Sequence, residues 1–260
     1  STSTHLPFTN RDDLLTALNN DAISDKEIKW DVIVIGGGIV GAGVLQEATR
    51  RGLKALLIEQ KDFAWGTSSR SSKMVHGGLR YIAQGDFKLT KHSLEERERL
   101  LKEAPGLINR MGYYFIIKQR QFPGRFVMGA LLKLYDWLAG IKDHKFLNVK
   151  ETINEFPSLK KDKLKGSCYY TDSVVDDSRL VVRVIQESIQ SGAQVLNYAQ
   201  VTTLLKDSRT GQITGVEIKD NVNESKQIET LNVRSSVVIN ATGAWADKLR
   251  SEVVDEKRVR

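Results

Sequence analysis

A glycine-rich turn between two apolar segments constrains this chain more than any other feature. Residues 31–43 read DVIVIGGGIVGAG, and residues 54–58 read KALLI. Gly36, Gly38 and Gly41 have the G-x-G-x-x-G spacing that, between a strand and a helix, is typical of dinucleotide-binding domains. The turn therefore predicts a parallel β-α-β unit with a phosphate-binding loop.

Each glycine of this turn has a physical role, and so does the acid that follows the second strand. Gly36 permits the tight turn, Gly38 lets backbone N–H groups approach a pyrophosphate, and Gly41 lets the helix pack closely on the strand. The N-terminus of the helix expected over residues 39–51 carries partial positive charge towards the phosphates. Glu59 comes 18 residues after Gly41, where a carboxylate can bind ribose hydroxyls. The alternative is a glycine turn in an ordinary α/β domain.

Composition and charge set the class of protein. The chain has 260 residues, 40% of them hydrophobic and 27% charged, as expected of a soluble globular protein with one large or two smaller domains. A net charge of +7 favours anionic ligands or an anionic membrane surface. We find no nucleic-acid recognition motif, and we predict no nucleic-acid partner. Cys168 is the only cysteine, which excludes an internal disulfide and a cysteine-based metal site; we predict no metal.

Periodicity places further elements along the chain. A tail over residues 1–9 precedes a short helix, capped by Asn10 or Asp12, that runs through Leu18. Charge pairs four residues apart, Glu95–Arg99 and Glu98–Lys102, indicate a solvated face on a helix over 86–103. We expect further helices over 127–141 and 178–191, and strands over 54–58, 113–118, 194–205, 213–219, 227–233 and 236–241.

These elements predict an α/β fold: a Rossmann-like domain with a parallel sheet, an antiparallel β-meander insertion, and part of a second, substrate domain. Ligands of open α/β sheets bind beyond the carboxyl ends of the strands. Gly36–Gly41, Glu59-Gln60 and Ala241-Thr242-Gly243 all follow such strands. A meander of this kind resembles the insertion common in flavin-binding rather than nicotinamide-binding domains, so we expect flavin. The predicted division is 1–29 (tail and helix), 30–110 with 165–250 (cofactor domain) and 111–164 (insertion).

Residues 66–81 combine hydroxyl groups with cations. Thr67 and four serines, Ser68, Ser69, Ser71 and Ser72, can donate hydrogen bonds to phosphates, and a planar Arg80 guanidinium suits a phosphate or carboxylate. An imidazole such as that of His76 can take a proton from a substrate hydroxyl near neutral pH, although a structural role is equally open. The alternative for the whole segment is a low-complexity linker, against which its large side chains argue.

The order of these motifs resembles the FAD-dependent glycerol-3-phosphate dehydrogenases over about residues 30–250. The motifs are GGGIVGAG at 36–43, GTSSRSSK at 66–73, HGGLRY at 76–81, DDSRL at 176–180 and NATGAW at 240–245. The resemblance implies an FAD-binding oxidoreductase. The family's chains continue well past the position of Arg260, so we expect an N-terminal portion of the family's length.

The resemblance also implies a set of site residues. FAD lies on the glycine turn with its ribose at Glu59, the backbone of Val201 meets the adenine, and His76 faces the flavin. Arg80 and Tyr81 line the glycerol 3-phosphate pocket, so His76, Arg80 and Tyr81 form the expected catalytic set. The expected cofactor-binding set is Gly36, Gly38, Ile39, Gly41, Glu59, Gln60, Thr67, Ser68, Ser69, Ser72, Lys73, His76, Gly77, Gly78, Leu79, Val201, Ala241, Thr242 and Gly243.

The implied reaction is the oxidation of sn-glycerol 3-phosphate to dihydroxyacetone phosphate, with electrons passed to a membrane quinone. Two alternatives stay open: an oxidase that uses oxygen, and an FAD-binding fragment without turnover. We expect a cytoplasmic location peripheral to a bacterial inner membrane, or the mitochondrial inner membrane, and a homo-oligomer. Cations interleaved with apolar residues over 118–145 suggest contact with an anionic membrane surface; core packing is the alternative.

Overall fold

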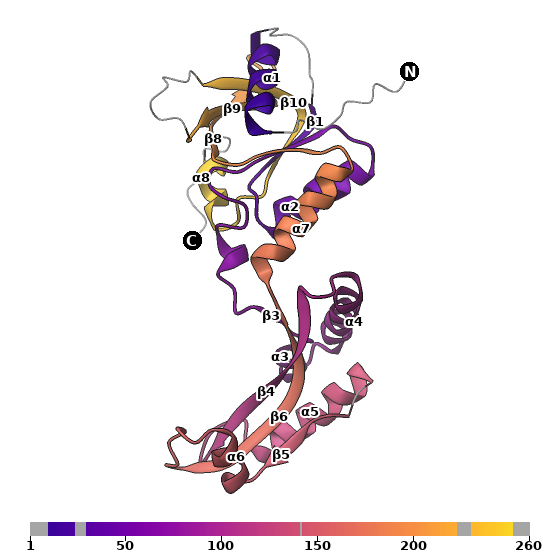
Figure 1. Ribbon diagram of the computed structural model, residues 1–260, viewed down its shortest axis with the longest axis vertical. Coiled ribbons are helices and arrows are strands. Elements are labelled where there is room, and N and C mark those ends of the chain that lie inside the picture. Colours follow the sequence, from indigo (N-terminus) through magenta and orange to yellow (C-terminus); the bar gives the residue numbers. More distant parts are fainter. Residues whose placement is uncertain (1–9, 24–29, 141, 223–229, 252–260) are drawn as a thin grey trace. The chain divides into compact units, whose positions relative to one another are not determined.

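A computed structural model describes residues 10–23, 30–140, 142–222 and 230–251 of the chain (Figure 1). The predicted tail over 1–9 and part of the predicted strand over 227–233 lie outside these residues. The chain divides into two compact units. Unit 1 comprises residues 1–71 and 177–260, and unit 2 comprises residues 72–176.

Unit 1 is built on a six-stranded mixed sheet with the order β7-β2-β1-β10-β9-β8. Strands β7, β2, β1 and the second half of β10 are parallel, whereas β8, β9 and the first half of β10 form an antiparallel meander. The predicted fold class is confirmed by this arrangement. The strands are β1 Trp30–Ile35, β2 Ala55–Ile58, β7 Gln194–Leu196, β8 Ala199–Lys206, β9 Ile213–Asp220 and β10 Leu231–Asn240. The helices are α1 Arg11–Ile23, α2 Ile39–Arg50, α7 Asp177–Gln190 and α8 Ala246–Arg250, with short 3₁₀ turns at Thr67–Ser69 and Gly243–Trp245.

Successive side chains of the strands in unit 1 point to opposite faces of the sheet, so the core has two layers. Ile33 and Ile35 of β1 pack with α1 and the meander on one face. Val32 and Val34 pack with Leu45 of α2 on the other face. Helix α7 lies beside α2 on that second face (Figure 1). The nearly continuous apolar strands of the sequence are therefore buried on both faces, as is usual for parallel sheets.

Strand β10 corrects the prediction of two separate strands over 227–233 and 236–241. Leu231–Arg234 pair antiparallel with β9, and the same strand continues to pair parallel with β1 from Ser235 to Asn240. The polar residues between the two apolar runs mark a change of partner rather than a turn. The reverse holds at 194–205, where Tyr198, with a positive φ of 50°, separates β7 from β8.

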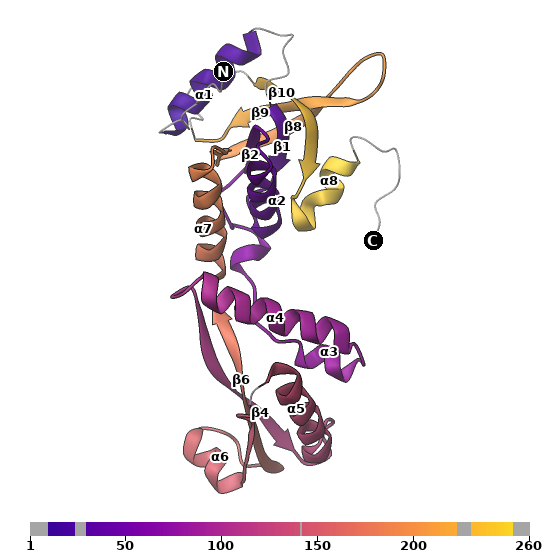
Figure 2. The same ribbon diagram turned by 90° about the vertical axis from the view of Figure 1, so that its right-hand side faces the viewer.

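Unit 2 is a four-stranded antiparallel sheet covered by helices. Its strand order is β3-β6-β4, with β5 also paired to β6. Helices α4 and α5 lie on one side of β4 and β6 (Figures 1 and 2). The elements are β3 Met74–Val75, β4 Ile108–Lys118, β5 Lys145–Leu147, β6 Leu164–Val175, α3 Leu79–Ala83, α4 Phe87–Glu103, α5 Arg125–Ala139 and α6 Val149–Glu155.

Strand β6, the centre of unit 2, has no counterpart among the predicted elements. Its residues include polar side chains that are fully buried, Ser167, Asp172 and Ser173, so the apolar pattern that marks a strand is absent. The predicted helix over 127–141 is α5, which starts two residues earlier and ends at Ala139; Ile141 lies outside the described residues.

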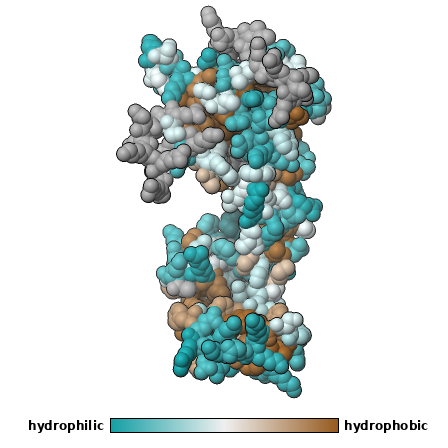
Figure 3. Space-filling view, turned by 90° about the vertical axis from the view of Figure 1, so that its left-hand side faces the viewer, coloured by the Kyte–Doolittle hydropathy of each residue, from teal (hydrophilic) through white to brown (hydrophobic). Residues whose placement is uncertain are grey.

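The two compact units do not follow the predicted domain boundaries. Residues 72–110 pack with 111–176 in unit 2, whereas the predicted cofactor domain comprised residues 30–110 and 165–250. The physical reason is β6, because both β3 and β4 pair with it. Exposed hydrophobic residues occur in both units and appear as brown patches among teal in the space-filling view (Figure 3).

Candidate functional site

The glycine turn of unit 1 follows directly on β1. Gly36 has a φ of +111°, and a Cβ atom built on it lies 2.6 Å from the carbonyl oxygen of Ala241. Its own N–H donates to the carbonyl oxygen of Ile58 at 2.8 Å. The turn is therefore wedged between β2 and the end of β10, and only glycine fits at this position.

Helix α2 begins directly after this turn, and its N-terminus has no acidic residue near it in the helix. The N-cap residue, Gly38, has no side chain that could cap the helix, and the first turn of the helix holds no acidic residue. The Ser68 hydroxyl accepts a hydrogen bond from the N–H of Ile39 at 2.9 Å. Partial positive charge at a helix N-terminus favours an anion, and a phosphate suits that place.

Glu59 is fixed beyond the end of β2 by two backbone donors. One carboxylate oxygen accepts from the N–H of Gly37 at 2.7 Å, and the other accepts from the N–H of Lys61 at 2.8 Å. Each carboxylate oxygen can accept a further hydrogen bond. The carboxylate is thus oriented and keeps acceptor capacity for hydroxyl groups of a ligand.

These groups line one cavity of about 550 Å³ in unit 1. That volume lies within the range of small-molecule and cofactor pockets, roughly 300–1,000 Å³. The predicted cofactor residues that line it are Gly36, Gly38, Ile39, Glu59, Gln60, Thr67, Ser68, Val201, Ala241, Thr242 and Gly243. Gly41 lies behind them, where a Cβ atom would collide with the carbonyl oxygen of Gly36. Glycine turn, helix N-terminus, carboxylate and cavity therefore fit a dinucleotide.

Two tryptophans belong to the cavity wall and were not among the predicted site residues. Trp65 and Trp245 have ring centroids 5.7 Å apart, and both line the cavity. The Lys61 ammonium lies 3.7 Å from the Trp65 ring centroid, and the Arg70 guanidinium carbon lies 4.4 Å from it. Trp65 directly precedes the Gly66–Lys73 motif. The residues around Trp65 do not indicate that Trp245 packs beside it.

The remaining predicted residues divide between the two units. Ser69 stays in unit 1, where its hydroxyl is 3.4 Å from the carbonyl oxygens of Trp65 and Gly66. The others belong to unit 2: Ser72, Lys73, His76, Gly77, Gly78, Leu79, Arg80 and Tyr81. Eleven of the predicted residues therefore line one cavity in unit 1, and eight lie in one segment of unit 2, residues 72–81, which includes β3 and the start of α3.

That segment holds the three predicted catalytic residues: His76 lies just before α3, and Arg80 and Tyr81 lie in its first turn. His76 and Arg80 are exposed, whereas Gly77 and Gly78 are buried. The His76 ring meets the Tyr81 ring edge-on, with 5.7 Å between ring centroids. Gly78 has a left-handed conformation, with φ +84°, and serves as the N-cap of α3. The His76 imidazole and the Arg80 guanidinium are thus exposed on either side of a buried Gly77-Gly78 pair.

On helix α4 the predicted charge pairs are corrected, although Glu95, Arg99 and Lys102 are exposed as expected of a solvated face. Glu95 pairs with Lys91, and Arg99 pairs with Glu96, rather than with each other. Arg97 is fully buried and pairs with Asp172, 75 residues later. Sequence reasoning missed this arginine because its partner is distant in the chain.

The fold and the cavity define a dinucleotide-binding α/β protein of the Rossmann type. Residues 31–260 match the family described as FAD dependent oxidoreductase, and the chain belongs to that family. The predicted FAD-binding fold and the predicted FAD-dependent oxidoreductase class are confirmed by this match.

Individual relatives are more specific. The aerobic glycerol-3-phosphate dehydrogenase of Staphylococcus haemolyticus is 37% identical over 243 residues, which is 92% of this chain and 43% of the relative. That of Bacillus subtilis is 38% identical over 226 residues, 86% of this chain and 40% of the relative. The chain thus spans about two fifths of the length of these relatives.

Solved structures agree with the fold. The glycerol-3-phosphate dehydrogenase from Bacillus halodurans complexed with FAD has a TM-score of 0.67 and 31% identity, and the match covers 92% of this chain and 38% of that one. The L-proline dehydrogenase from P. horikoshii, at 20% identity and a TM-score of 0.62 over 90% of this chain and 58% of that one, supports the fold alone.

Proposed function

We propose that the protein containing this chain oxidises sn-glycerol 3-phosphate to dihydroxyacetone phosphate with FAD as its redox cofactor. The observation that carries the proposal is the unit 1 cavity, where Gly38, Glu59 and Ser68 provide places for pyrophosphate and ribose. The names of the relatives and of the FAD-complexed structure support the same reading.

In this proposal, different residues of the chain bind the cofactor, bind the substrate and accept the proton. Gly36–Gly41 and Glu59 hold the cofactor, which, when bound, supplies the acceptor for the hydride that leaves C2 of the substrate. His76 takes the proton of the C2 hydroxyl. Arg80 pairs with the substrate phosphate, and Tyr81 lines the same pocket.

Bleaching of the bound yellow flavin by glycerol 3-phosphate, without oxygen, tests this proposal in the full-length protein. Glycerol, which lacks the phosphate, is the matched control and should leave the colour unchanged. Retention of the yellow colour with glycerol 3-phosphate would leave an FAD-binding module without this activity as the better account.

Two variants separate binding from chemistry. Arg80→Ala removes a hydrogen bond to a charged group, so substrate binding should weaken by about ten- to a hundredfold with FAD content unchanged. His76→Gln should slow flavin reduction by about 10²–10⁴-fold, as for loss of a general base. Near wild-type values for either variant would remove that residue from the proposed role.

We further propose that the electrons pass to a membrane quinone at an anionic bilayer surface, contacted by residues 118–145. Phe122, Phe126 and Trp137 of this stretch are 83%, 93% and 76% exposed. Met128 and Leu132 are buried, so part of the stretch is core, as the alternative reading required. No helix among the described residues is long and apolar enough to cross a membrane.

Sedimentation with anionic and neutral vesicles over a salt series tests this contact. Binding should require anionic lipid, weaken with salt, and fall when Arg120, Arg125 and Lys133 are changed to Glu. Equal binding after those changes would exclude the stretch. Release of peroxide during turnover would favour the oxidase alternative over the quinone.

A further inference from the structure

The His76–Gly78 loop is anchored from inside unit 2. The N–H of Gly77 donates to the Asp172 carboxylate, with distances of 3.0 and 3.2 Å to its two oxygens. The hydroxyl of Thr90, on α4, lies 3.3 Å from the carbonyl oxygen of Gly78 and 2.9 Å from that of Asp86, and it can donate to either. Both anchoring side chains are fully buried, so the loop is held through its backbone while His76 stays exposed.

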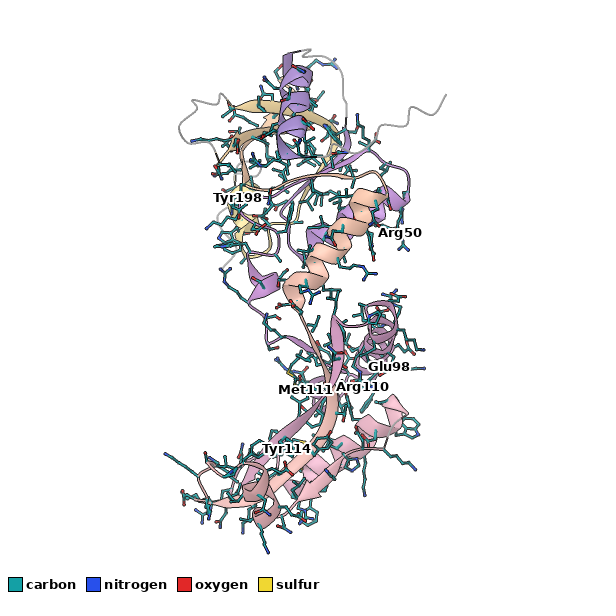
Figure 4. All side chains as sticks on the ribbon, viewed as in Figure 1. Arg50, Glu98, Arg110, Met111, Tyr114 and Tyr198 are labelled. Atoms are coloured by element: carbon teal, nitrogen blue, oxygen red, sulfur yellow. The ribbon has the colours of Figure 1, made fainter. Side chains whose placement is uncertain are left out.

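The anchor itself belongs to a buried ionic network. One Arg97 nitrogen donates to Asp172 at 3.0 Å and to the Tyr135 hydroxyl at 2.9 Å, and the other donates to Glu98 at 3.0 Å. Glu98 in turn pairs with Arg110 at the surface, where Figure 4 labels both side chains. Burial raises the pKa of the Asp172 carboxyl, and hydrogen bonds from Arg97 and Gly77 oppose that rise.

Side chains also pack closely around Gly77. A Cβ atom at this position would collide with the Tyr135 hydroxyl and with Leu94. The loop, β6, α4 and α5 therefore meet at one point, and each supplies a group that fixes the His76–Gly77 peptide.

Stability alone is a weak reason for such a network. A buried ion pair often contributes no more than well-packed apolar residues of similar volume, because two charges lose their hydration. Here the Arg97 Nε is also buried without a hydrogen-bond partner. Hydrophobic residues in place of Arg97 and Asp172 would not fix the position of the Gly77 backbone, as the Asp172 carboxylate does.

We infer that Arg97, Asp172 and Tyr135 are positioning residues that hold the His76–Gly78 loop in the geometry needed for reaction. None of the three is assigned a contact with substrate or cofactor; they act through the backbone of Gly77. The inference rests on the proposed function, because it is His76 and Arg80 whose positions are set.

The test uses the full-length flavoprotein with two variants and one control. Asp172→Asn keeps an oxygen acceptor but removes the charge, and Tyr135→Phe removes only a hydroxyl. The control, Thr152→Val, deletes a buried hydrogen bond to Ser167 (3.0 Å) elsewhere in unit 2. Ser167 lies five residues from Asp172 along β6, about 16 Å at 3.3 Å per residue.

Two measurements are made on each protein. Hydrogen exchange of a peptide spanning the loop is followed without substrate, and flavin reduction by glycerol 3-phosphate is followed in a single turnover. Asp172→Asn should speed exchange in the loop at least tenfold and slow reduction by about ten- to a hundredfold, since misplacement by 1 Å can cost that much. Tyr135→Phe should change both in the same direction by less, and Thr152→Val should change neither.

Several outcomes would overturn the inference. Faster exchange with unchanged reduction, or slower reduction with unchanged exchange, would each separate the loop from the reaction. If Asp172→Asn does not fold, Tyr135→Phe decides by the same two measurements. If the wild-type flavin is not reduced by glycerol 3-phosphate, the proposed function fails by itself. In that case exchange in the loop still decides whether Asp172 anchors it, and unchanged exchange overturns the anchor.

Discussion

The cavity of unit 1 and the loop of unit 2 are built in opposite ways. The cavity depends mainly on backbone groups and glycines at the ends of strands, with Glu59 fixed by two N–H donors. The loop depends on buried polar and charged side chains, Arg97, Asp172 and Tyr135, that come from three separate elements. A site of the first kind fails when volume is added, and a site of the second kind fails when one member of a charged network is removed.

The largest expected effect follows from breaking the network in unit 2. Arg97→Met leaves Asp172 buried without its charged partner, and breaking a buried pair in this way costs about 3–5 kcal/mol. The double variant Arg97→Met/Asp172→Leu should recover much of that loss, because no uncompensated charge remains. Chemical denaturation measures both, and a double variant as unstable as the single one would argue against an electrostatic cause.

Adding one methyl group to the turn of unit 1 should have the next largest effect. Gly36→Ala forces a Cβ atom into a positive-φ position against the Ala241 carbonyl, at a cost of about 2–4 kcal/mol, and should lower FAD content. Gly43→Ala is the matched control on α2, since a Cβ atom there meets nothing within 4 Å. That variant should gain up to about 1 kcal/mol from helix propensity. Equal behaviour of the two variants would contradict the steric reading of the turn.

A smaller, pH-dependent effect is expected where α1 docks onto unit 1. Arg11 forms an ion pair with Asp220. Burial raises the pKa of the Asp220 carboxyl, but hydrogen bonds from Arg11 and Val222 oppose this rise, and the pKa is lowered overall. A lowered carboxyl pKa contributes stability above the ordinary value of about 3.9, and this contribution is lost as pH falls through the folded pKa.

Arg11→Met should therefore cost about 1.5–3 kcal/mol at neutral pH. The difference from wild type should shrink below about pH 4. Urea denaturation at several pH values measures it. A difference that is constant down to pH 2 would mean that the pair does not stabilise the fold electrostatically.

The smallest signal comes from Cys168, which reports on unit 2 alone. Burial raises the pKa of its thiol to about 11, and its side chain is inaccessible, so thiol reagents should label it slowly at neutral pH. Arg97→Met should speed the labelling, whereas Gly36→Ala should not. Faster labelling in both variants would show that the two units unfold together. The units would then differ in how their sites are built but not in their stability.

The local parts of the fold could be predicted from the sequence. The Asn10 side chain accepts from the N–H of Asp13 at 2.8 Å, and α1 starts there as expected, although it runs to Ile23 rather than Leu18. Helices α2, α4 and α7 lie within two residues of their predicted bounds. Such elements depend on caps and on apolar spacing between near neighbours, which the sequence displays directly.

The distant parts could not be predicted in this way. Strand β6 is half polar, and the single strand β10 changes its partner at Ser235. In both cases the partner strand, not the local residues, satisfies the backbone and decides the element.

The sequence by itself determined the β-α-β unit and the placing of the glycine turn, helix N-terminus and Glu59 around one ligand. These features depend on sterics and hydrogen bonds within about 30 residues of chain. Only the tertiary structure decided that Trp245 stands beside Trp65, and that Arg97 lies buried against Asp172. An exposed and a buried arginine look alike on a charged helix, because the partner that permits burial comes from a strand 75 residues away.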